Sequence, residues 1–214
     1  MIKKYKGTLL VGSIVTLLPI LAGLLLWEQL PEQLPIHWGP TGEVDGWCSK
    51  IQAVFLMPAV MLAIHWFCVL ATTMDPKNKN QSKKPMILVL WLCPVLSLVV
   101  SAMSLGTAMG WQFDAIPLMI LFFAALFMVL GNYLPKCTHN YTIGIKIPWT
   151  LNSEANWNAT HRFAGKIWFA GGLLMLPCSF LPSFWPVVAM MAFTLAMVIV
   201  PIVYSWRFYQ RENV

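Results

Sequence analysis

Charged residues are scarce in this chain. Lys, Arg, Asp and Glu make up 10% of its 214 residues, whereas 58% are hydrophobic. Ordinary soluble domains carry about 25% charged residues. This shortage excludes a soluble globular domain and predicts an integral membrane protein, so the net charge of +6 does not indicate direct binding of nucleic acid.

Six hydrophobic runs are long enough to cross a membrane. A bilayer core about 30 Å thick needs roughly 20 helical residues at about 1.5 Å each. The runs cover approximately residues 8–27, 51–72, 86–108, 115–134, 163–181 and 185–205. We therefore expect an all-α polytopic membrane protein with about six transmembrane helices, set in the cytoplasmic (inner) membrane.

The links between these runs lie alternately on the two sides of the membrane, and basic residues are almost absent from the links on one side. Lys and Arg resist translocation and therefore mark the cytoplasmic side of a membrane protein. Every Lys and Arg except Lys50 lies before the first run, between the second and third, around the link from the fourth to the fifth, or after the sixth. This places both termini in the cytoplasm. The polar stretch at residues 75–84, which includes Lys79, reads as a short solvated loop on that side.

Motifs for catalysis, metal binding and disulfide formation are also missing. The chain has no HExxH, no GxSxG and no glycine-rich phosphate loop, and its five cysteines suggest no disulfide framework. His65 alone is an ionisable side chain deep within a hydrophobic run. We favour a neutral, hydrogen-bonded histidine over a proton relay, because a relay needs several acidic or histidine partners. We expect no catalytic residue, no metal and no cofactor.

The first link, residues 30–50, is rich in turn-forming residues and predicts a small extracytoplasmic hairpin between the first two helices. We call this segment the outer hairpin. His37 and Asp45 carry its chemistry, but a zinc site usually takes at least three protein ligands. The favoured interpretation is that Asp45 caps a turn and that Lys50 anchors at the lipid headgroups.

A polar segment at residues 141–172 separates two hydrophobic runs, and we call it the inner segment. Gly144 allows an otherwise strained turn, and Pro148 forces its predecessor into an extended conformation. Ser153 is a good N-cap for a helix that begins near Glu154, with Asn156 at the third helical position. The helix continues into the fifth span, with a bend expected at Gly165.

Three basic residues on the inner segment are open to several interpretations. Lys146, Arg162 and Lys166 suit a lipid phosphate, an acidic partner surface or a helix C-terminus. An interfacial elbow fixed by Trp149 and Trp157 explains the segment equally well. Composition does not choose between these alternatives.

The order of residues in the inner segment, IGIKIPWTLNSEANWNATHRFAGK, resembles the signature of the SdpI family of toxin-immunity membrane proteins. The positions that carry this resemblance are Ile143, Gly144, Lys146, Pro148, Trp149, Thr150, Trp157, His161, Arg162, Phe163, Ala164, Gly165 and Lys166. Lys146 stands where the pattern usually has Arg, and Ile147 where it usually has Thr. Asn156, from the capping argument, completes the predicted partner-binding set.

The outer hairpin is similar to the segment of unknown function that commonly precedes that signature. The matching candidates are His37, Trp38, Gly42, Asp45, Gly46 and Lys50. The order of runs and links predicts an N-terminal two-helix unit at residues 1–72, a middle helix pair at 73–134 and a third unit at 135–214, and the two resemblances cover the first and third of these.

The resemblance implies a membrane immunity and signalling protein. It would protect against a secreted toxin outside the cell and hold an ArsR-type repressor at the membrane inside, while contacting lipid throughout. In this hypothesis the inner segment presents Trp157, His161 and Arg162 to the cytoplasmic partner. The alternative is a small transporter or permeation pathway lined by His65 or by the serines of the third run.

Overall fold

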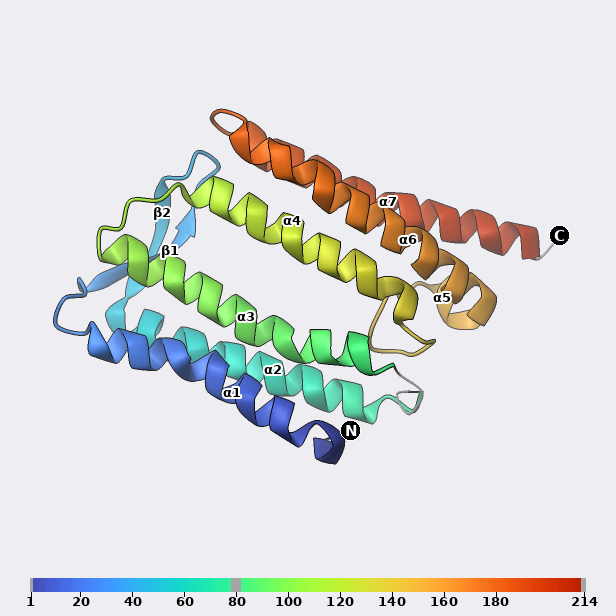
Figure 1. The fold of residues 1–214 in the computed structure, drawn as a ribbon, viewed down its shortest axis with the longest axis horizontal. Coiled ribbons are helices and arrows are strands. Elements are labelled where there is room, and N and C mark those ends of the chain that lie inside the picture. Colours follow the sequence, from blue (N-terminus) through green and yellow to red (C-terminus); the bar gives the residue numbers. More distant parts are fainter. Residues whose placement is uncertain (1, 78–81, 213–214) are drawn as a thin grey trace. The chain divides into compact units, whose positions relative to one another are not determined.

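Six long helices dominate the computed structural model, which describes residues 2–77 and 82–212 (Figure 1). The long helices are α1 (Ile2–Leu25), α2 (Met57–Met74), α3 (Lys83–Ala108), α4 (Ala115–Tyr133), α6 (Glu154–Met175) and α7 (Trp185–Glu212). Each belongs to a segment long and apolar enough to span a membrane. The prediction of six transmembrane helices is confirmed. Lys79 lies outside the described residues.

Contacts divide the chain into two compact units. Unit 1 comprises the described parts of residues 1–73 and 86–115, and unit 2 those of residues 74–85 and 116–214. This division differs from the three predicted segments, because α3 packs within unit 1 and α4 within unit 2. The helices expected to form a middle pair therefore contribute to different cores.

Unit 1 joins three helices to a small antiparallel sheet. Strands β1 (Gln33–Trp38) and β2 (Val44–Ser49) form the predicted hairpin, and the π-helical turn η1 (Gln52–Leu56) leads into α2. Leu30, Leu34 and Val54 are buried beneath the hairpin and pack against the end of α3. This apolar contact holds the sheet against its helices, since an isolated two-stranded hairpin is marginal in water.

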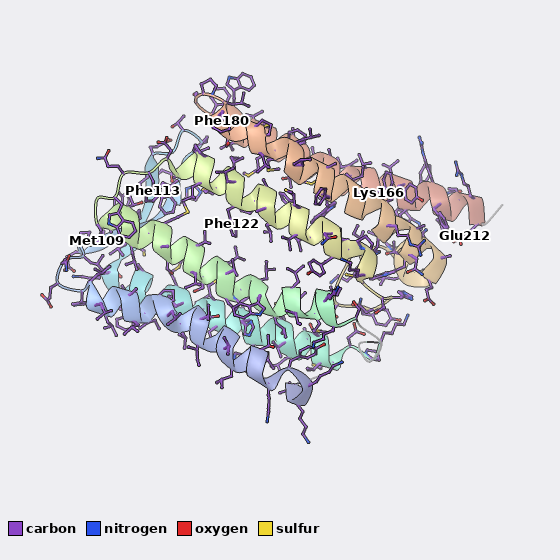
Figure 2. The ribbon with its side chains drawn as sticks, viewed as in Figure 1. Met109, Phe113, Phe122, Lys166, Phe180 and Glu212 are labelled. Atoms are coloured by element: carbon purple, nitrogen blue, oxygen red, sulfur yellow. The ribbon has the colours of Figure 1, made fainter. Side chains whose placement is uncertain are left out.

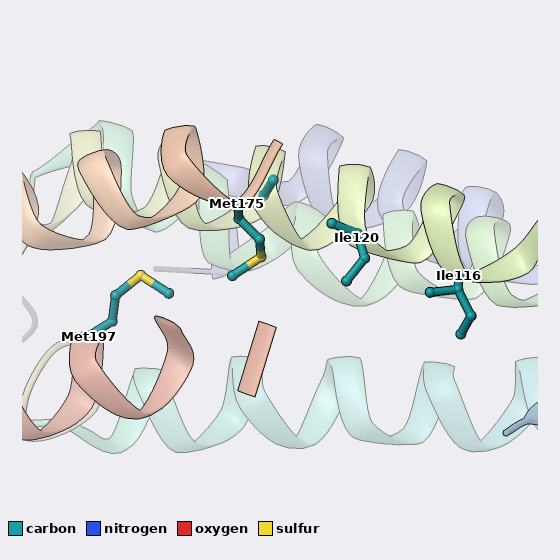
Figure 3. Close-up of a cluster of buried hydrophobic side chains, with 5 residues drawn as sticks. Ile116, Ile120, Met175 and Met197 are labelled. Atoms are coloured by element: carbon teal, nitrogen blue, oxygen red, sulfur yellow. The ribbon is translucent and has the colours of Figure 1, made fainter. Parts of the chain in front are cut away.

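Unit 2 is built around α4, α6 and α7. Its core contains Ile116, Ile120 and Ala124 from α4, with Met175 from α6 and Met197 from α7. Figure 3 shows the two isoleucines and the two methionines. The indole nitrogen of Trp168 donates a hydrogen bond to the Met197 carbonyl at 2.8 Å. In a membrane the hydrophobic drive between helices is weak, so such close packing and interhelical hydrogen bonds supply the association.

Glycines bring α4 and α6 into backbone contact. A side-chain carbon added at Gly165 would lie 2.7 Å from the Gly131 carbonyl oxygen, and one added at Gly172 would lie 2.6 Å from the Ala124 carbonyl oxygen. Only glycine allows this approach. The helix α6 runs without interruption from Glu154 to Met175. At Gly165 the absence of a side chain serves helix packing.

Short elements complete the two ends of unit 2. The 3-10 turn η3 (Leu134–Lys136) follows α4, α5 (Pro148–Asn152) precedes α6, and η4 (Leu176–Phe180) ends it. Figure 2 shows Phe180 at the end of the unit opposite Glu212. Phe180 is 89% exposed. The other end, by contrast, is closed by the packed polar elements described next.

Candidate functional site

Trp157 is the centre of the inner segment. Its side chain is fully buried, and the indole nitrogen donates to the Cys137 carbonyl at 2.8 Å. The His161 ring stacks on it at 4.1 Å between centroids, and His139 approaches at 5.1 Å. The expectation that Trp157 and His161 face a partner directly is therefore corrected, because both rings lie in the interior and position the surrounding backbone.

Both ring nitrogens of His161 are occupied. Nδ1 donates to the Trp157 carbonyl at 2.8 Å, and Nε2 accepts the backbone N–H of Ile145 at 2.9 Å. This arrangement fixes a neutral ring with the proton on Nδ1. Gly144, at φ 126°, lies flat against the same rings, and a side-chain carbon there would overlap His161 Nε2. The sequence signature thus encodes a fit between a glycine turn and an aromatic stack.

Asn156 is the centre of a second buried contact. Its amide donates to the Ser205 carbonyl at 2.9 Å, and its oxygen accepts the hydroxyls of Thr160 and Ser205. The backbone N–H of Asn156 bonds Ser153 Oγ at 3.1 Å, which confirms the predicted cap. The Asn156 side chain, however, takes no part in the cap and instead links α6 to α7. Thr160 and Ser205 were missed from sequence because neither belongs to a recognisable motif.

The turn before α6 is closed by the residues of the PWT sequence. Ile147 is extended, as predicted for the residue before a proline, with φ −122° and ψ 159°. The Thr150 hydroxyl is buried and lies 2.7 Å from the Ile145 carbonyl, and it accepts the Ile147 N–H. Trp149 packs near Tyr209 of α7 at 6.4 Å between centroids. Pro148 and Thr150 therefore shape the turn.

Asp75 and Asn140 are buried polar residues that the sequence reading missed. Asp75 is 6% exposed, and its carboxylate accepts the N–H of Tyr141 at 2.7 Å and the hydroxyl of Thr142 at 3.0 Å. Asn140 accepts the N–H groups of Thr142 and Ile143. The interpretation of residues 75–84 as a solvated loop is therefore wrong at its first residue, which holds the start of the inner segment in place.

The exposed residues of the inner segment include its three predicted cations. Lys146, Arg162 and Lys166 all reach the surface of unit 2. Arg162 and Lys166 border an open groove of about 500 Å³ between the ends of α4 and α6, but Lys146 does not. The structure therefore brings Arg162 and Lys166 together at the groove and leaves Lys146 outside it.

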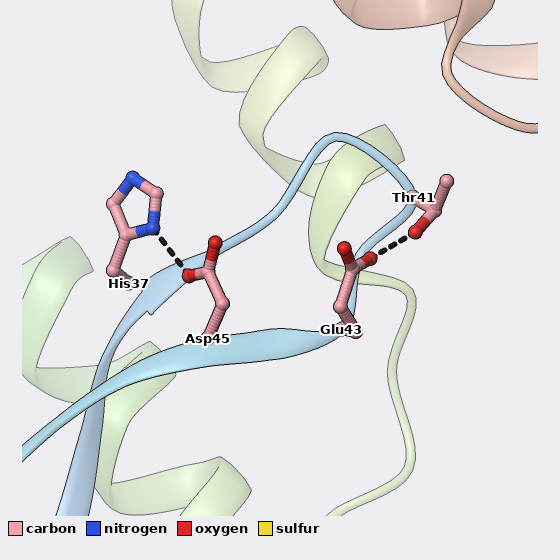
Figure 4. Close-up of polar contacts among 4 residues, drawn as sticks. All are labelled: His37, Thr41, Glu43 and Asp45. Carbon is pink, nitrogen blue, oxygen red and sulfur yellow. Dashed lines mark hydrogen bonds and ion pairs between the residues drawn. The ribbon is translucent and has the colours of Figure 1, made fainter.

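The polar side chains near the turn of the outer hairpin lie at the surface. His37 Nδ1 and Asp45 Oδ1 are 2.5 Å apart across the two strands, and the Thr41 hydroxyl donates to the Glu43 carboxylate (Figure 4). That hydroxyl lowers the pKa of Glu43. Gly46 lies opposite His37, where a side-chain carbon would come within 2.7 Å of the His37 Cβ. Asp45 thus pairs with His37 and does not cap a turn.

Three other outer-hairpin residues have structural roles. Gly42 adopts φ 94° in the turn, and Trp38 ends β1 opposite Val44. Lys50 is buried, and its ammonium group donates to the carbonyls of Trp27 and Leu30 at 3.1 and 3.0 Å. Lys50 is therefore not a headgroup anchor as expected, because it satisfies carbonyls just after α1.

Neither a cluster of metal ligands nor a disulfide bond occurs among the described residues. Within residues 2–77 and 82–212, no three His, Cys, Asp or Glu side chains lie together in a way that could hold a metal ion. All five cysteines are free thiols, and burial raises the pKa of Cys137 to about 12. The described polar groups of the inner segment thus favour a structural arrangement over a reactive one.

His65 differs from the histidines of the inner segment. Its side chain is buried in unit 1, and among the described residues its Nε2 finds no hydrogen-bond partner; Ser13 and Ser104 have the same deficit at Oγ. The expected hydrogen bond to His65 is therefore absent at that nitrogen. Ser97, one of the serines of the third run, donates to the Thr16 carbonyl at 2.9 Å, a helix packing contact.

Comparison with known proteins finds a match to a protein family in the C-terminal part of the chain and another in the N-terminal part. Residues 136–205 match the model of the SdpI/YfhL protein family, and residues 14–62 match a domain of unknown function, DUF1648. The immunity protein SdpI of Bacillus subtilis (strain 168) is 26% identical over 213 residues, covering 95% of this chain and 97% of the relative. No solved structure matches. The resemblance to the SdpI family is confirmed, and the chain is a multi-pass protein of the cell membrane.

Proposed function

Because the chain resembles the SdpI family along nearly its whole length, we propose that it is a non-enzymatic immunity protein that protects its cell from a secreted toxin. The observation that carries the proposal is the 26% identity to immunity protein SdpI over 95% of this chain and 97% of that relative. Such coverage includes the outer hairpin, the inner segment and all six spans, so the resemblance is not confined to one motif.

The outer hairpin is the proposed toxin-binding surface. Its exposed side chains include Glu32, Glu43 and Asp45, while its one basic residue, Lys50, is buried. The Thr41 hydroxyl favours the ionised form of Glu43. An acidic surface of this kind favours a cationic partner, since complementary charge steers association. Trp47, 53% exposed, adds an aromatic contact of the type enriched at binding interfaces.

A survival assay tests the immunity proposal. Bacillus subtilis strain 168 cells that lack their own immunity protein SdpI would express this chain and be exposed to culture supernatant from toxin-producing cells. We expect colony counts well above those of cells carrying an empty vector. Counts no higher than the vector control, with this chain present in the membrane, would contradict the proposal.

We propose further that the inner face holds a repressor of the ArsR type. Lys146 is exposed beside the buried stack of Trp157 and His161, so rearrangement of the turn at Gly144 would move it. A photo-crosslinking residue placed at 146 should capture an ArsR-type protein, identified by mass spectrometry. The same residue at Ser49, on the outer hairpin, is the control. Capture of nothing, or of another class of protein, would contradict this part.

A further inference from the structure

The groove between α4 and α6 has the shape and chemistry of a lipid site. Its lining residues are Gly131, Asn132, Pro135, Arg162, Gly165, Lys166 and Phe169, and it has a volume of about 500 Å³. Gly131 and Gly165 approach each other so closely that a side chain on either would collide with the opposing backbone, so neither residue puts a side chain into the groove. A shallow, open groove of this kind at the cytoplasmic end of unit 2 can admit a headgroup from the adjoining membrane.

The groove is positively charged and unneutralised. Arg162 and Lys166 lie one turn apart on α6, and within the described part of the chain neither makes an ion pair or a side-chain hydrogen bond. Lys136 adds a third charge nearby, because its ammonium group lies 3.5 Å from Asn132 Oδ1. That contact leaves the Asn132 amide as a further donor. No acidic residue lines the groove, so an anion with several acceptor oxygens fits best.

The exposed face of α6 changes from cationic to apolar along its length. Arg162 and Lys166 are followed at helical spacing by Phe169 and Leu173, which are 43% and 49% exposed. Arg162 and Lys166 lie in the first half of this span, on the side that its basic residues assign to the cytoplasm, and the apolar pair lies further into the bilayer. This order matches a phospholipid, with its phosphate at the headgroup level and its acyl chain below.

We propose that the groove binds an anionic membrane phospholipid. The phosphate contacts Arg162, Lys166 and the Asn132 amide, and one acyl chain packs along Phe169 and Leu173. An acidic peptide would satisfy the cations but would leave the apolar half of the face without a partner of its own. The inference goes beyond the immunity function, because it requires neither toxin nor repressor.

Lipid retention by the purified protein tests the proposal. The detergent-solubilised chain would be titrated with phosphatidylglycerol or phosphatidylcholine, and bound lipid would be counted by native mass spectrometry. We expect preferential retention of phosphatidylglycerol. Since each basic residue near a membrane surface contributes roughly 1 kcal/mol, the double variant Arg162→Gln, Lys166→Gln should bind it about 25-fold more weakly.

Matched variants and competitors separate the possible outcomes. Lys146→Gln removes an exposed charge outside the groove and should change lipid affinity less than about twofold. Phe169→Ala should weaken both lipids. Unchanged phosphatidylglycerol binding by the double variant, with its thermal unfolding midpoint preserved, would overturn the proposal. So would equal retention of both lipids, or complete displacement by millimolar inorganic phosphate, which would indicate a site for free anions.

Discussion

The outer hairpin and the inner segment contain similar residue types but use them in opposite ways. His37 and Asp45 pair at the surface, with side chains 71% and 46% exposed. His161 and Asn156 are almost completely buried, and their polar atoms bond to backbone or to other side chains. Polar residues that stay at the surface remain available for recognition, whereas buried ones define a conformation. The inner signature therefore specifies a shape, and the exposed cations around it are available to bind.

Replacing Trp157 with Ala should produce the largest loss of stability. The change removes a fully buried indole and leaves the Cys137 carbonyl without its donor. Truncation of a buried aromatic costs about 3–5 kcal/mol. The unfolding midpoint in detergent is the measurement, and Trp206→Ala, at a half-exposed tryptophan on α7, is the control. Equal shifts for the two variants would show that the stack is not the centre of the inner segment.

Gly144→Ala should be the next most damaging change. A left-handed residue with a side chain costs about 1–3 kcal/mol, and the added carbon would also collide with the His161 ring. Hydrogen exchange at the Ile145 amide should accelerate, because that N–H bonds His161 Nε2. Gly7→Ala, where no atom lies within 4 Å, is the control. An unchanged exchange rate at the Ile145 amide would argue against the packing of the Gly144 turn on the His161 ring.

Asn156→Ala and Asn158→Ala compare a buried and an exposed amide on one helix. Loss of the Asn156 amide removes its bond to the Ser205 carbonyl and leaves the hydroxyls of Thr160 and Ser205 without their acceptor. Leaving buried polar groups unpaired costs about 1–3 kcal/mol. The unfolding midpoint should fall for Asn156→Ala and stay near wild type for Asn158→Ala, which is exposed. Similar values for both would remove the contrast between buried and exposed polar residues.

Asp45→Asn should have the smallest effect on stability and a clear effect on survival. The His37 pair is solvent-exposed, and exposed ion pairs contribute less than about 1 kcal/mol. Toxin survival should nevertheless fall, because the acidic surface loses a charge. Gln33→Ala, at an exposed position on the same sheet, is the control. Wild-type survival with Asp45→Asn would remove the hairpin from the proposed toxin site.

Local features of the sequence predicted much of the fold. Apolar runs of about 20 residues can do little else in a bilayer than form spanning helices, so the six spans were predictable. Turn-forming residues in the first link indicated the hairpin. The N-cap at Ser153 and the extended Ile147 followed from local backbone preferences, which depend on neighbours only a few residues away.

Contacts between distant residues could not be predicted in this way. Asp75 bonds Tyr141 across 66 positions, and Asn156 bonds Ser205 across 49. Nothing near Asp75 in sequence distinguishes a buried acceptor from an ordinary loop acid. Lys50 was similarly misread, because its burial depends on the carbonyls that follow α1. The exposure of a polar residue depends on its tertiary partners.

The glycine contact between α4 and α6 has a mechanical consequence. A seam made of side chains can slide by exchanging rotamers, but the Gly131 and Gly165 backbones have no rotamers to exchange. Shear along this seam would require backbone atoms to separate and leave a gap, and gaps in packed protein are unfavourable. Any inward transmission by unit 2 should therefore move α4 and α6 together as one rigid body.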